Sequence, residues 1–99
     1  MAVQGETKKR VKTELREPKR YKVIMHNDDY TPMDFVVQIL IEVFLKEKEE
    51  AVRIMFQVHK GGGAVVGTYS FDIARTKVKI AMSLAKDEGY PFRLTMEEA

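Results

Sequence analysis

The chain has 99 residues, of which 44% are hydrophobic and 32% charged, a composition typical of one small globular domain. It contains no cysteine, which excludes a disulfide scaffold, a zinc–thiolate site and a thiol nucleophile. Its apolar stretches are shorter than the roughly 18 residues of a membrane span, and residues 1–20 lack the apolar core of a secretory signal. We therefore expect a cytoplasmic protein, not associated with a membrane, that binds a ligand or performs simple chemistry.

The net charge of +2 is unevenly distributed along the chain. Residues 1–20 hold seven basic and three acidic side chains and no aromatic one, so they offer little surface to bury. They are predicted to form a flexible basic N-terminal extension, and residues 21–99 the folded domain. A basic arm can contact nucleic acid. Because residues 21–99 carry more acidic than basic side chains, a solvated extension is favoured and no nucleic acid partner is expected.

The first half of the domain is predicted to hold one strand and two helices. Residues 21–27 have the β-branched content and alternation of a strand, and a turn follows at 27–30. Thr31 is expected to be the N-cap of a buried helix that begins with Pro32 and continues to Leu45. A second helix is predicted over 47–60, because apolar residues recur there every three or four positions. Gly61–Gly63 should end it.

The second half is predicted to add two strands and a third helix. Residues 64–69 favour a strand, and Ser70 can cap a helix that Gly89 ends. Apolar and polar residues alternate over 92–96, which indicates a last strand. The predicted fold class is α+β, a small sheet of three strands packed against three helices in the order β-α-α-β-α-β.

Enzymatic chemistry has limited support in the sequence. Asp28 and Asp29 could form an acid–base pair with His26 or His59, but carboxylates before a helix also stabilise turns and helix N-termini. A metal ion at His26, Asp28 and Asp29 would lack a further ligand. There is no nucleophile elbow, dinucleotide fingerprint or P-loop, so no cofactor is expected.

Several motifs together resemble one known family. The run Asn-Asp-Asp-Tyr-Thr-Pro-Met at 27–33 resembles the ClpS family, bacterial adaptors that deliver N-degron substrates, proteins marked by their first residue, to the Clp protease. The resemblance extends over about residues 20–99. It implies a non-catalytic, monomeric adaptor with a three-stranded antiparallel sheet. The later matching segments are Met55-x-x-Val58-His59, Gly67-x-Tyr69, Thr76-Lys77-Val78 and the stretch from Pro91 to Glu97.

The resemblance also implies a binding site for a protein's first residue. A free α-amino group is mostly an ammonium at neutral pH, with three donors and no acceptor, so its site must offer acceptors. The implied ligands of that group are Asn27, Asp28, Asp29 and His59. A pocket beside them would take a first side chain of Leu, Phe, Tyr or Trp, with Met33 at its entrance. The implied pocket residues are Met25, Thr31, Pro32, Met33, Val36, Met55, Val58 and Phe92.

The implied partner is the N-terminal domain of the ClpA or ClpC unfoldase, with Asp72 and Lys77 at the contact and ClpP as the protease. Two other hypotheses stay open at this point. One is a hydrolase that uses Asp28 or Asp29 with His59. The other is a ribosome-associated module that binds RNA through the basic extension, and it predicts binding that salt weakens.

Overall fold

The computed structural model describes residues 18–99. The extension predicted for residues 1–20 therefore lies outside the described residues except for its last three positions. Within the described part of the chain, no helix has both the length and the apolar composition needed to cross a bilayer.

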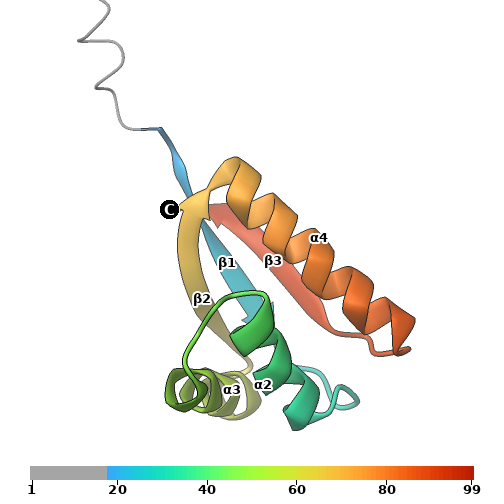
Figure 1. Cartoon of the computed structure of the whole chain (residues 1–99). Coiled ribbons are helices and arrows are strands. Elements are labelled where there is room, and N and C mark those ends of the chain that lie inside the picture. Colours follow the sequence, from blue (N-terminus) through green and yellow to red (C-terminus); the bar gives the residue numbers. More distant parts are fainter. Residues whose placement is uncertain (1–17) are drawn as a thin grey trace, which may run out of the picture.

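The described chain forms six elements in the predicted order β-α-α-β-α-β. They are β1 (Arg20–His26), α2 (Met33–Glu42), α3 (Lys48–Gly61), β2 (Gly63–Ser70), α4 (Phe71–Asp87) and β3 (Arg93–Glu98). The sheet has the order β2-β1-β3, and both pairs are antiparallel. Figure 1 shows α4 running along the sheet, while α2 and α3 gather at the end of β1 where the chain leaves the sheet. The predicted α+β fold is confirmed.

The hydrophobic core lies between the central strand and the three helices. Val23 and Met25 on β1 are completely buried, and α2 contributes Leu40 to the same cluster. The buried side chains of α4 are three alanines, at 74, 81 and 85. Small side chains allow a helix to lie close to a sheet, because protein interiors are packed without gaps. The core thus fixes the end of β1, where the site described below begins.

The first strand begins one residue before the predicted domain boundary at residue 21. Arg20 pairs with Ser70 of β2, and its carbonyl oxygen accepts a hydrogen bond from the Ala99 N–H at 2.8 Å. The Lys19 ammonium lies 3.7 Å from a Glu98 carboxylate oxygen. Main-chain pairing thus brings Arg20 into the sheet, and charge composition alone does not reveal such pairing.

The bounds of α2 differ from the prediction at both ends. Pro32, with extended backbone angles, occupies the N-cap position that was predicted for Thr31. At the other end the helix stops at Glu42 and not at Leu45. Leu45 has a φ of 56°, in the left-handed region, and the Lys46 N–H donates to the Leu40 carbonyl oxygen at 3.0 Å. A residue in the left-handed region cannot continue a right-handed helix.

Candidate functional site

The loop between β1 and α2 is organised by the Asp28 carboxylate. Its Oδ1 accepts hydrogen bonds from the N–H groups of Tyr30, at 2.8 Å, and Thr31, at 2.7 Å. Its Oδ2 accepts one from the Thr31 hydroxyl at 2.8 Å. This is an Asx turn, in which an aspartate replaces the main-chain acceptor of an ordinary turn. Thr31 is thus bound to Asp28 and does not cap α2.

These bonds also set the charge state of the loop. Burial alone would raise the pKa of the Asp28 carboxyl, but hydrogen bonds from the Thr31 N–H, the Thr31 hydroxyl and the Tyr30 N–H outweigh it. Together they lower the pKa of Asp28 below its ordinary value of 3.8. Both oxygens of the ionised carboxylate are therefore already engaged within the loop.

The end of α3 lies beside this loop because of one glycine. Gly62 has a φ of 86° and ends the helix, and its N–H donates to the Val58 carbonyl oxygen at 3.0 Å. Its own carbonyl oxygen accepts a hydrogen bond from the Asn27 N–H, also at 3.0 Å. Since His59 is in the last turn of α3, this bond brings the ends of β1 and α3 to the same place.

This junction allows a matched pair of glycine substitutions. We expect Gly62→Ala to lower the free energy of unfolding by about 1–2 kcal/mol, since a left-handed backbone disfavours any side chain with a Cβ. A Cβ at Gly62 would meet no atom within 4 Å, so the cost comes from the backbone alone. Gly61→Ala is the control, because its Cβ is equally unobstructed and its φ is not positive. Urea denaturation of both variants measures the difference, and equal stabilities would contradict this account.

The loop, the start of α2 and the end of α3 surround one cavity of about 350 Å³. One part of its lining is polar, from the loop and the last turn of α3. The other part is apolar, from α2 and α3. The lining residues are Asn27, Asp28, Asp29, Tyr30, Thr31, Pro32, Met33, Val36, Met55, Val58 and His59.

The two parts of the lining differ in their exposure to solvent. Val36, Met55 and Val58 are at least 92% buried, since their exposed fractions are 8%, 7% and 4%. Asn27, Asp29 and His59 are exposed, and Met33 is 41% exposed. The cavity therefore has an apolar interior and a polar rim that carries carboxylate, amide and imidazole groups. Such a site can hold a cation and an adjacent apolar group at the same time.

Not every residue expected at the pocket lines this cavity. Met25 and Phe92 are absent from its lining. Met25 is completely buried in the core, and Phe92 packs edge-on against Phe35 with ring centroids 5.8 Å apart. Tyr30 lines the cavity, although it was not among the expected site residues. Its position inside the motif at 27–33, next to Asp29, was the only sequence signal for it.

The residues of the enzymatic alternative are only partly brought together. Asp28, Asp29 and His59 share the cavity, but His26 does not line it. The His26 Nε2 lies 2.7 Å from the Thr95 hydroxyl on β3. Among residues 18–99 no group of three or more histidine, aspartate or glutamate side chains is arranged to hold a metal ion.

The two residues expected to contact an unfoldase lie elsewhere, on α4. Asp72 and Lys77 line a separate hollow of about 400 Å³ between the end of α2 and α4. The Lys77 ammonium donates to the Val43 carbonyl oxygen at 2.7 Å and lies 5.6 Å from the centroid of the Tyr69 ring. Lys77 is thus held in place by its own domain, whereas Asp72 is exposed in the first turn of α4.

This geometry defines a small α+β domain with a cavity that combines polar acceptors with an apolar interior. The model of the family described as ATP-dependent Clp protease adaptor protein ClpS matches residues 16–95. The chain belongs to this ClpS family.

Relatives and a solved structure support the same assignment. The chain is 53% identical to the ClpS adapter protein of Clostridium acetobutylicum over 87 residues, which cover 88% of this chain and 86% of that protein. It is 51% identical to that of Oleidesulfovibrio alaskensis over 85 residues, 86% of this chain and 82% of the relative. The structure of Agrobacterium tumefaciens ClpS2 bound to L-phenylalaninamide matches with a TM-score of 0.81 at 43% identity, covering 84% of this chain and all of that one.

Membership of this family fixes the class of activity. These relatives are adaptor proteins of the Clp protease and not catalysts. The protein is therefore an adaptor of the Clp protease, as the sequence motifs implied, and the hydrolase hypothesis is wrong.

Proposed function

We propose that this protein binds the free α-amino group and the bulky hydrophobic first side chain of N-degron substrates. The observation that carries the proposal is the cavity at 27–33, whose rim offers acceptors and whose interior is apolar. L-phenylalaninamide, the ligand of the similar ClpS2, unites a free α-amino group with a benzyl side chain. The polar rim of the cavity can accept hydrogen bonds from such an amino group, and its apolar interior suits such a side chain.

The amino group is assigned to the polar rim. Asn27 contributes its amide oxygen, Asp29 a carboxylate and His59 a ring nitrogen, and all three are exposed at the cavity. Asp28 was expected to act with them, but both of its oxygens accept hydrogen bonds inside the loop. We therefore assign it the task of holding the loop in shape. An internal peptide N–H offers one donor and no charge, so it leaves the rim acceptors partly unpaired, at a cost of about 1–3 kcal/mol for each acceptor that the bound peptide shields from water.

The first side chain is assigned to the apolar interior. Val36, Met55 and Val58 form the buried wall, and Met33 lies at the entrance. Filling this space with Leu, Phe, Tyr or Trp removes apolar surface from water, which stabilises a complex by about 1.5–3 kcal/mol for a Leu or Phe side chain. Met33 in turn disfavours the β-branched Ile and Val, whose bulk lies close to the main chain.

Delivery is the second part of the proposal. The adaptor would bring its substrate to the N-terminal domain of ClpA or ClpC for unfolding and for proteolysis by ClpP. Asp72 and Lys77, at the hollow between α2 and α4, are the proposed contact residues. They share no lining residue with the cavity at 27–33, so one domain can hold a substrate and an unfoldase at the same time.

A titration with two peptides tests the binding proposal. A fluorescent peptide that begins with Leu should bind, and its N-acetylated twin should bind at least about a hundredfold more weakly, because acetylation removes the charge and two of three donors. Fluorescence anisotropy measures both affinities. A third peptide that begins with Ser should also bind weakly, since it leaves the apolar interior unfilled. Equal binding of the Leu peptide and its acetylated twin would refute the assignment of the rim.

A further inference from the structure

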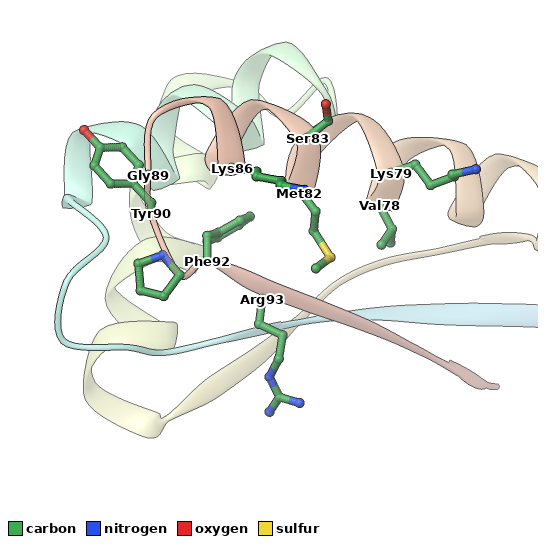
Figure 2. A pocket seen from close by; sticks show the side chains of 10 residues that line it. Val78, Lys79, Met82, Ser83, Lys86, Gly89, Tyr90, Phe92 and Arg93 are labelled. Atoms are coloured by element: carbon green, nitrogen blue, oxygen red, sulfur yellow. The ribbon is translucent and has the colours of Figure 1, made fainter.

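A third hollow, of about 760 Å³, opens between the second half of α4 and the segment that leads into β3 (Figure 2). It shares no lining residue with the cavity at 27–33 or with the hollow at Asp72 and Lys77. The task proposed for the protein so far uses neither this hollow nor its side chains. Its lining residues are Val78, Lys79, Met82, Ser83, Lys86, Gly89, Tyr90, Pro91, Phe92 and Arg93.

The interior of this hollow is apolar. Figure 2 shows Met82 from α4 and Phe92 from the segment before β3 pointing into it from opposite sides. Phe92 is only 4% exposed, whereas Met82 is 36% exposed. Methionine adapts its shape to different apolar partners, so a partly exposed Met82 can pack against an incoming side chain.

The charged residues of the lining are all basic. Lys79, Lys86 and Arg93 are exposed, and Figure 2 shows Lys79 and Arg93 extending away from the centre of the hollow. None of the three forms an ion pair within the described residues, and no carboxylate lines the hollow. An apolar floor with unpaired cations at its rim is complementary to a ligand that carries carboxylates around an apolar group.

The adjacent edge of the sheet is also free. β3 is an outer strand of the sheet, paired with β1 on one side and with no strand of residues 18–99 on the other. Main-chain groups on such an edge can pair with an added strand, and this is a common way of binding an extended peptide. Arg93 belongs both to the hollow and to β3, so the edge begins where the hollow lies.

We propose that the hollow and the free edge of β3 together bind an extended acidic segment of a partner protein. Its main chain pairs with the first residues of β3, one apolar side chain lies against Met82 and Phe92, and its carboxylates face Lys79, Lys86 and Arg93. This arrangement keeps the segment away from the exposed Glu97 and Glu98 at the far end of the strand. The free strand edge and the apolar floor favour a polypeptide over a nucleic acid, which would need a broader basic surface.

The test uses the full chain and a peptide that cannot occupy the α-amino site. The probe is the heptapeptide Glu-Leu-Glu-Val-Glu-Leu-Glu with an acetylated N-terminus and an amidated C-terminus, added to ¹⁵N-labelled protein. We expect its addition to shift the amide NMR signals of residues 78–98 and to leave those of 27–33 unchanged. A peptide with lysine at each glutamate position should cause no shift.

Charge reversal supplies the matched control. The double variant Lys86→Glu with Arg93→Glu should bind the acidic peptide at least about tenfold more weakly. The variant Lys48→Glu with Lys60→Glu changes the net charge equally on exposed positions of α3 and should bind normally. The proposal would be overturned by shifts confined to other surfaces or by equal effects of the two double variants. Self-association of the free chain through β3, or an equal response of the same residues to a uridine oligonucleotide, would also overturn it.

Discussion

Replacing Asp29 by alanine should weaken binding of a Leu-initiated peptide at least about tenfold. Asp29 is the carboxylate at the rim of the cavity for which the structure shows no hydrogen bond within residues 18–99, so it is the one free to accept from an incoming ammonium. Hydrogen bonds to a charged group contribute about 1.5–3 kcal/mol, and 1.4 kcal/mol corresponds to a factor of ten in affinity. Fluorescence anisotropy with the labelled peptide measures the loss.

A nearby carboxylate provides the control for this variant. Asp34 is exposed in the first turn of α2 and does not line the cavity. Asp34→Ala removes the same charge from the same region and should change the affinity by no more than about threefold, as expected for a solvent-screened charge. If both variants bind equally well or equally badly, Asp29 does not contact the ammonium.

Replacing Asp28 by alanine should weaken both the fold and the binding, whereas Asp28→Asn should preserve most of each. Alanine removes three hydrogen bonds from the loop, with an expected loss of about 1–2 kcal/mol in unfolding free energy. An asparagine amide can still accept from the Tyr30 and Thr31 N–H groups and form an Asx turn. If Asp28 bound the ammonium through its charge, the alanine and asparagine variants would lose peptide affinity equally. The pair of variants therefore distinguishes a residue that shapes the loop from one that contacts the ligand.

The lowered pKa of Asp28 gives this prediction a pH dependence. A group whose pKa is lowered in the folded state contributes stability above its unfolded value, here 3.8, and loses it as the pH falls through the folded value. The free energy of unfolding of the wild type should therefore exceed that of Asp28→Asn most at neutral pH, and the difference should shrink below pH 3.8. Denaturant unfolding at pH 7 and pH 3 measures it, and a difference that is constant with pH would contradict the assigned hydrogen bonds.

Strand alternation, helical spacing and glycine positions predicted the element order, because those signals are local. The end of α2 was not predictable in the same way. Leu45 has no sequence property that favours a left-handed backbone, and the bond from Lys46 to Leu40 closes only in the folded chain. Thr31 is a good N-cap by composition, yet its N–H and hydroxyl both donate to the Asp28 carboxylate, and the helix begins one residue later, with Pro32 at the N-cap.

The candidate site followed mostly from the motif at 27–33 and the segment at 55–59. That these two segments share one cavity depends on tertiary contacts, such as the bond from Asn27 to Gly62. Phe92 shows what a motif leaves open. Its place in the chain suggested the pocket, and in the structure its ring packs against Phe35 and is not among the side chains that line the cavity. Burial of this kind depends on the packing of several elements and is not visible in a motif.

A crystal structure of the protein with a short peptide that begins with Leu tests the central proposal most directly. The proposal predicts the leucine side chain among Val36, Met55 and Val58. It also predicts the α-amino nitrogen at about 2.7–3.2 Å from oxygen atoms of Asn27 and Asp29. A peptide bound on another surface, or an α-amino group that faces solvent while the cavity at 27–33 stays empty, would contradict it.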